Sequence, residues 1–192
     1  MTSFWWVRHG PTHEKAFVGW RDVPADLSDL DRIARLEAHL PREAVLVSSD
    51  LSRAVTTADA IAGNRIRLPH APALREFDFG VWDGMRFNDV ASRDPDLSRR
   101  FWESPGDVAP PDGESWNDVA ERVGACVADL NQRHSGRDIV VVAHIGVIMT
   151  QIQAASGMTA SEVLAHQIDN LSVTRLDFSA GRWSVGMINH QP

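Results

Sequence analysis

The sequence predicts an α/β protein, a three-layer α/β/α sandwich in which helices cover both faces of a mainly parallel central sheet. Two observations predict this class. Strand-like and helix-like patterns take turns along the chain, which is typical of parallel sheets. The 192 residues are 43% hydrophobic and 23% charged, a length and composition that suit one well-packed domain over residues 1–192.

The first strand and the first helix follow from an apolar run and a helical repeat. Residues 4–7 (Phe-Trp-Trp-Val) form the run, and Gly10-Pro11-Thr12 ends it. A helix closed by Pro41 is predicted next, because apolar residues recur at roughly helical spacing. These residues are Leu30, Ile33, Ala34, Leu36 and Leu40.

A second strand and helix come next. Residues 44–47 predict a short buried strand that ends in Ser48-Ser49-Asp50, residue types that cap helices well. The following helix ends before Gly63-Asn64. Its helical period is set by Ala54, Val55, Ala58, Ile61 and Ala62. Residues 78–113 are rich in Gly, Pro, Asp and aromatic residues with poor periodicity, so we expect an excursion from the sheet with room for one short helix.

The third unit has the clearest periodicity. A helix starting at Ser115 and ended by Ser135-Gly136 has one apolar face. That face consists of Trp116, Val119, Val123, Cys126, Val127 and Leu130. Residues 139–143 form the most hydrophobic strand, which stops at His144-Ile145-Gly146, and residues 147–155 predict the next helix.

The last two strand-like segments form a terminal hairpin or edge pair. Residues 172–178 and 183–188 flank the turn Ser179-Ala180-Gly181. An edge strand offers unpaired backbone groups to a neighbouring chain, so the hairpin hints at a homodimer.

Composition excludes several classes of function. The net charge of −7 argues against a nucleic-acid partner, because no basic stripe is present, but it allows a local pocket with two or three guanidinium groups. The lone Cys126 is interpreted as a buried small hydrophobe, and no disulfide framework or thiolate metal site can form within one chain. No leader-like or membrane-spanning apolar segment is present, so we expect a cytoplasmic location and no membrane partner.

Three predicted strand ends carry groups that suit phosphate chemistry. In open parallel sheets, ligands bind at the carboxyl ends of the strands, where residues 8–10, 48–53 and 144–146 follow three strands here. An imidazole can attack phosphorus while a guanidinium holds two phosphate oxygens. Taken singly, Arg53 is interpreted as a solvated residue of a first helical turn and His144 as a core histidine. Together, two histidines and two arginines at one sheet edge predict a phosphate site.

Five ordered motifs, spread over nearly the whole chain, resemble those of the histidine phosphatases, also called the phosphoglycerate mutase-like superfamily. The first is Val7-Arg8-His9-Gly10-Pro11-Thr12, similar to the family's opening Arg-His-Gly motif. The others are residues 48–58, similar to its second arginine motif, residues 74–84, similar to the segment that carries its acid, residues 113–115 with Arg122, and residues 142–146, similar to its second histidine motif.

The resemblance implies a phosphoglycerate mutase-like fold and a set of site residues. His9 is the implied nucleophile, Glu76 the implied proton donor to the leaving alcohol, and Arg8, Arg53 and His144 the implied contacts to the phosphoryl oxygens. The route passes through a phosphohistidine and requires no metal and no cofactor. The substrate-binding candidates are Thr12, Lys15, Trp20, Arg21 and Ile145.

Two of these candidates depart from the family pattern. Lys15 stands near a position where the family often has a phosphate-contacting Asn, so its charge would have to substitute for that contact. Ile145 replaces a common Gly after the second histidine but keeps its backbone N–H.

The compact length and residues 77–84 resemble the small phosphatase branch that includes the α-ribazole-phosphate phosphatases. We therefore expect a histidine acid phosphatase-type phosphoric monoester hydrolase whose partner is a small phosphorylated metabolite. A cofactor-dependent phosphoglycerate mutase would use the same residues, and a non-catalytic module that binds a phospho-ligand is the third hypothesis.

Several aromatic residues could line the mouth of a substrate pocket, although packing in the core is the more frequent role of such residues. They are Trp20, Phe77, Phe79, Trp82 and Trp102.

Overall fold

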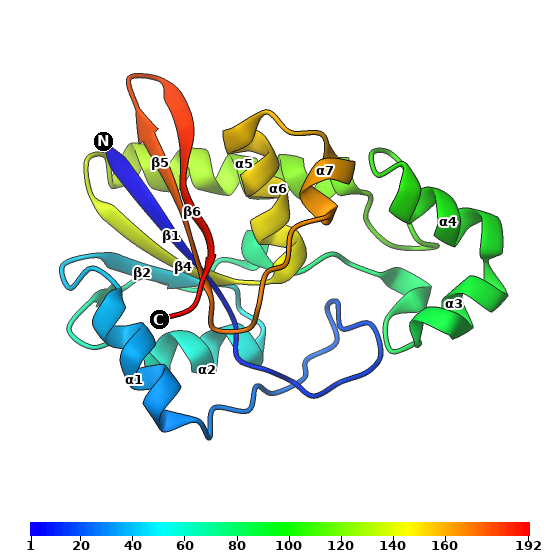
Figure 1. Cartoon of the computed structure of the whole chain (residues 1–192), viewed down its shortest axis with the longest axis horizontal. Helices are drawn as coiled ribbons and strands as arrows, with labels where there is room; N and C mark the ends of the chain where they lie inside the picture. The colour runs from blue at the N-terminus through cyan, green and yellow to red at the C-terminus, as the bar shows by residue number, and fades with distance from the viewer.

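A six-stranded sheet forms the middle layer of the computed structural model, which describes all 192 residues (Figure 1). The strand order is β3-β2-β4-β1-β5-β6; the first four strands are parallel, and β5 pairs antiparallel with β1 and β6. The predicted mainly parallel sheet and terminal hairpin are confirmed. The strands are β1 Thr2–Arg8, β2 Val45–Ser48, β3 Ile66–Arg67, β4 Asp138–Ala143, β5 Val173–Ser179 and β6 Arg182–His190.

Helices cover both faces of the sheet, as the sequence predicts. Along β4, Val140 and Val142 join the buried cluster under α1 and α2, whereas Ile139 and Val141 join the larger cluster under α5, α6 and α7. Successive strand residues point to opposite faces, so these two clusters define the three layers. The helices are α1 Leu30–His39 and α2 Ser52–Ala60 on one side, and α5 Trp116–Arg133, α6 Ile145–Ser156 and α7 Ala160–Leu164 on the other (Figure 1).

The excursion between residues 78 and 113 contains two α-helices rather than one. They are α3 Phe87–Arg93 and α4 Pro95–Glu103, which pack on each other and project from one side of the molecule (Figure 1). Pro95 explains the division, since proline disfavours a helical conformation for the residue before it and suits the first turn of a new helix.

Two local predictions were wrong. Ser48, Ser49 and Asp50 do not cap α2, whose N-cap is Leu51 without a side-chain hydrogen bond. The Asp50 carboxylate instead accepts two hydrogen bonds from Arg75, at 2.7 and 2.6 Å. Cys126 is only partly buried against the core under α5. None of the helices has both the length and the apolar composition needed to cross a membrane.

Candidate active site

Two histidines lie side by side just past the ends of the two central strands. Arg8 of β1 is in register with Ala143 of β4, and the backbone N–H of His9 donates to the carbonyl of Ala143 at 3.1 Å. The next residue on each strand is therefore a histidine at the carboxyl edge of the sheet. The ring centroids of His9 and His144 are 5.1 Å apart.

The environment of His9 determines which ring nitrogen is free. Its Nδ1 lies 2.7 Å from the carbonyl oxygen of Gly10, which can only accept a hydrogen bond, so Nδ1 carries the proton. In a neutral ring, Nε2 then holds the lone pair. Thr57 accepts from the Gly10 N–H at 3.0 Å and Asn170 donates to the His9 carbonyl at 2.8 Å, so the peptide that joins His9 to Gly10 is held at both of its polar groups.

Both histidines are held in the neutral form. Burial, helped by the positive charges of Arg53 and Arg8, lowers the pKa of His9 from 6.5 to about 3, although the bond to Gly10 opposes this shift. Burial, together with neighbouring His9 and Arg53, lowers the pKa of His144 well below its ordinary value. A neutral His9 has the lone pair that nucleophilic attack requires.

Two guanidinium groups flank this pair, that of Arg53 buried and that of Arg8 partly buried. Arg53, only 1% exposed, donates to the carbonyls of Arg21 at 3.0 Å and Gly19 at 2.7 Å, and Arg8 donates to Ile168 at 2.5 Å. The Nε of each arginine and both ring nitrogens of His144 are buried without a hydrogen-bond partner. Unpaired buried donors are rare in folded proteins, and this set suits the oxygens of an anion such as a phosphoryl group.

Glu76 is the buried carboxyl group of the site. It is 4% exposed, and its two oxygens accept from the backbone N–H groups of Phe77 at 3.0 Å and Gly146 at 3.2 Å. Burial raises the pKa of Glu76, while these hydrogen bonds and the charges of Arg53 and Arg8 oppose the rise. A carboxyl group with a raised pKa can carry a proton near neutral pH and then release it.

An ion pair between Arg122 and Glu114 holds the segment that presents Glu76. Arg122 on α5 forms a two-pronged pair with Glu114, with N–O distances of 2.7 and 2.6 Å. The same guanidinium donates to the carbonyls of Ala73, Arg75 and Glu76, at 2.9 to 3.0 Å. The indole N–H of Trp20 also donates to the Glu76 carbonyl, at 2.8 Å. The backbone at Glu76 is therefore fixed from two sides.

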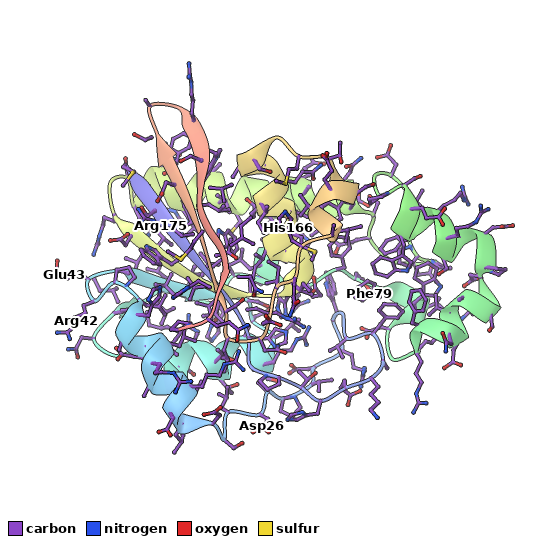
Figure 2. The ribbon with its side chains drawn as sticks, viewed as in Figure 1. Asp26, Arg42, Glu43, Phe79, His166 and Arg175 are labelled. Atoms are coloured by element: carbon purple, nitrogen blue, oxygen red, sulfur yellow. The ribbon has the colours of Figure 1, made fainter.

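A cavity of about 430 Å³ opens onto these groups. Phe79, which lies at the junction between the α3–α4 pair and the rest of the molecule, is part of its wall (Figure 2). The other lining residues are Arg8, His9, Thr12, Glu14, Ala16, Phe17, Val18, Glu76, Phe77, Phe101, Trp102, Pro105, Trp116, Ile145, Gly146, Met149 and Leu164.

The structure brings together some of the predicted site residues and leaves others outside. Thr12 and Ile145 line the cavity with Arg8, His9 and Glu76; the buried Arg53 acts electrostatically on His9, and the buried ring of His144 lies beside that of His9. The remaining candidates do not line the cavity: Lys15 is exposed, Trp20 supports Glu76, and Arg21 pairs with Glu14 at 3.0 Å.

Sequence reasoning missed the supporting residues. The side chains of Thr57 and Asn170 bind backbone groups of the His9–Gly10 peptide, and the backbone N–H of Gly146 binds Glu76; no pattern of residue types marks such contacts between side chains and backbone. Glu114 and Arg122 belong to a recognised motif, but the motif does not reveal that the pair holds Glu76. Among the aromatic residues, Phe77, Phe79 and Trp102 line the cavity, whereas Trp82 is buried in the core.

Comparison with known proteins places these observations in a family. The model of the histidine phosphatase superfamily (branch 1) matches residues 4–191. A bifunctional protein of Mycobacterium tuberculosis is 33% identical over 177 residues, which cover 90% of this chain and 46% of that protein, so the chain spans about half the length of this relative. A 2,3-bisphosphoglycerate-dependent phosphoglycerate mutase of Mesorhizobium japonicum is 29% identical over 82% of this chain and 83% of its own length.

Solved structures agree with this relationship. YhfR of Bacillus stearothermophilus superposes with a TM-score of 0.90 at 26% identity, covering 99% of this chain and 98% of its own. A mycobacterial glucosyl-3-phosphoglycerate phosphatase superposes with a TM-score of 0.86 at 25% identity, covering 99% of both chains. The α-ribazole phosphatase of Shigella flexneri, at 23% identity over 98% of this chain and 96% of its own, shares the fold with a TM-score of 0.83.

Proposed function

The chain belongs to the histidine phosphatase superfamily (branch 1), and we propose that it is a phosphomonoesterase that passes the phosphoryl group of a small phosphorylated metabolite first to His9 and then to water. The observation that carries the proposal is the state of His9: a buried, neutral imidazole whose Nδ1 is bonded to Gly10 and whose Nε2 holds the lone pair.

In the first step, Nε2 of His9 attacks phosphorus, a P–N bond forms and the P–O bond to the leaving alcohol breaks. Arg8, Arg53 and His144 contact the phosphoryl oxygens and offset the charge on the transferring group. Protonated Glu76 gives its proton to the leaving oxygen, so the product departs as a neutral alcohol. The raised pKa of Glu76 supports this role.

In the second step, Glu76 accepts a proton from water, the water oxygen attacks phosphorus and the P–N bond breaks. His9 is released neutral and Glu76 is protonated again, so the site returns to its starting state. The side chains named here supply the nucleophile, the acid–base group and the positive charge, so the proposal calls for no metal and no cofactor.

A phosphoglycerate mutase is the second candidate, and the sequence similarity to a named mutase favours it. A mutase would use the same first step but return the phosphoryl group to a second hydroxyl instead of water. A module that binds a phospho-ligand without turnover would have no use for the neutral His9 or for the raised pKa of Glu76.

Phosphate release in EDTA tests the proposal. Wild type and His9→Ala are compared on a panel of phosphomonoesters, including 3-phosphoglycerate and α-ribazole phosphate, without a bisphosphate primer. Wild type is expected to release inorganic phosphate and His9→Ala to release none. The far-UV circular dichroism of His9→Ala should match that of wild type, which shows that the variant is folded. Release that requires the primer would support the mutase instead, and equal release by both proteins would remove His9 as the nucleophile.

A further inference from the structure

The cavity wall beyond the phosphoryl-binding residues is apolar and largely aromatic. It is assembled from four parts of the chain: the loop after β1, the segment after Glu76, the end of α4, and helices α5 to α7. Its six aromatic members are Phe17, Phe77, Phe79, Phe101, Trp102 and Trp116. Such a wall stabilises a ligand by removing apolar surface from water and by ring–ring contact.

The rings also support each other, so the shape of the wall is fixed. Phe17 stacks on Trp102 with an interplanar angle of 15° and a centroid distance of 5.9 Å. Phe77 stacks on Phe79 at 16° and 6.0 Å, and the ring of Phe101 meets that of Trp102 edge-on at 4.8 Å. A preformed wall of this kind spends little conformational entropy when a ligand binds.

Positive charge is confined to one end of the cavity. Arg8 is the only lysine or arginine among the lining residues, and the proposed reaction uses it for the phosphoryl group. The charged residues that remain are Glu76 and Glu14, and the Glu14 carboxylate is paired with Arg21 at 3.0 Å. A carboxylate on the leaving alcohol would therefore lose its water without gaining a cation, which is unfavourable.

From this wall and this charge distribution we propose that the enzyme selects phosphate monoesters whose alcohol part is uncharged and apolar, such as one bearing an aromatic ring. The inference rests on the proposed phosphatase activity and adds the substrate class. With about 430 Å³ for the whole substrate, the cavity lies at the small end of ligand pockets, so the alcohol is of metabolite size.

Three primary-alkyl monophosphates provide the test: 2-phenylethyl phosphate, glycerol 1-phosphate and 3-phosphoglycerate. Their leaving groups are all primary alcohols, so differences in kcat/KM report chiefly on contacts with the cavity wall. We expect kcat/KM for 2-phenylethyl phosphate to exceed that for 3-phosphoglycerate by about 100-fold or more, with glycerol 1-phosphate between them.

A matched pair of variants tests whether the wall causes the preference. Phe17→Leu removes a ring from the cavity, and Phe178→Leu removes one that packs on Trp183, away from the cavity. Phe17→Leu is expected to reduce the preference for 2-phenylethyl phosphate by about tenfold. Phe178→Leu is expected to leave it unchanged.

The outcomes separate the two proposals. Phosphate release that depends on His9 but favours 3-phosphoglycerate, or does not distinguish the three esters, overturns the substrate class and leaves the phosphatase activity in place. No release from any ester overturns the phosphatase activity and the substrate class with it. If Phe17→Leu and Phe178→Leu change the preference for 2-phenylethyl phosphate equally, the aromatic wall of the cavity is not its cause.

Discussion

The position of His9 and the location of its ring proton depend on contacts with a few backbone groups. The carbonyl of Gly10 fixes the proton on Nδ1, and Thr57 and Asn170 fix the peptide that joins His9 to Gly10. Because burial and two arginines keep the ring neutral, its lone pair is present at physiological pH. Because His9 stays neutral in the folded protein but takes up a proton in the unfolded chain, the free energy of unfolding decreases at low pH.

The pH dependence of stability should show this decrease. As pH falls below 6.5, the unfolded chain protonates His9, whereas the folded chain does not until about pH 3, so stability is lost across this window. At pH 5 the loss from one such histidine is about 2 kcal/mol relative to neutral pH. His9→Ala should therefore lose about 2 kcal/mol less than wild type between pH 7.5 and 5 in urea unfolding.

His144 provides the control for this measurement, since its pKa is also depressed by burial and remains so in the His9 variant. Some loss of stability on acidification should therefore persist in His9→Ala. Identical pH profiles for the two proteins would contradict the neutral, buried state assigned to His9.

Glu76→Gln should separate proton donation from phosphoryl transfer. The amide keeps the size of the side chain but is not an acid, so kcat/KM for an alkyl phosphate should fall about 100-fold or more. The first turnover of 4-nitrophenyl phosphate should be affected much less, because nitrophenolate leaves without a proton. Stopped-flow detection of a nitrophenolate burst followed by slow turnover would support the role, and equal losses for both esters would refute it.

The meeting of His9 and His144 could be predicted because each directly follows a buried strand, and strand ends in a parallel sheet converge by topology. The supporting residues of the site could not be predicted. Arg122 reaches the carbonyl of Glu76 across 46 sequence positions, through a contact between a side chain and the backbone. The types of residue in the sequence do not indicate which carbonyl group a guanidinium group will contact.

At the scale of elements, long periodic segments were predicted well and short ones poorly. Helices α1, α5 and α6 were predicted from their apolar spacing, and Ser115 caps α5 through a reciprocal pair with Asp118. Helix α7 has only five residues and was not predicted, although Thr159 and Glu162 form the same capping box. Strand β3, with two residues, exists through its pairing with β2 and has no periodicity to detect.

The start of α6 is the element on which the position of Glu76 depends. A Cβ atom built on Gly146 would lie 2.5 Å from both the Glu76 carboxylate and the Phe77 ring, so Gly146→Ala must displace them. Because small displacements of catalytic groups are costly, we expect kcat to fall about tenfold to 100-fold.

Gly124→Ala is the matched control. Gly124 lies inside α5, and a Cβ atom at this position would have no neighbour within 4 Å beyond the backbone of its own helix. Alanine should therefore leave kcat unchanged and raise stability by up to about 1 kcal/mol. Steady-state kinetics and thermal unfolding of both variants check the pair. Unchanged kcat in Gly146→Ala would show that catalysis does not depend on the close approach of the Gly146 backbone to Glu76.

In the whole molecule, the site lies where the two central parallel strands end, between the helical layers and beside the projecting α3–α4 pair (Figure 1). The alternation of strands and helices was sufficient to predict the layers. It was not sufficient to predict the cavity, because the α3–α4 pair that completes the aromatic wall comes from the least periodic part of the sequence. β6 is an edge strand, and the homodimer that it suggests stays a prediction.

The most direct test of the account is to trap the phosphorylated protein. Wild type and His9→Ala are mixed with a phosphate monoester that wild type hydrolyses, quenched within milliseconds in alkaline denaturant to preserve phosphohistidine, and analysed by intact-mass and peptide mass spectrometry. We predict one phosphoryl group per wild-type chain, labile to acid and located on His9, and none on the variant. Hydrolysis by wild type without any phosphorylated chain, or a phosphoryl group on another residue, would contradict the account.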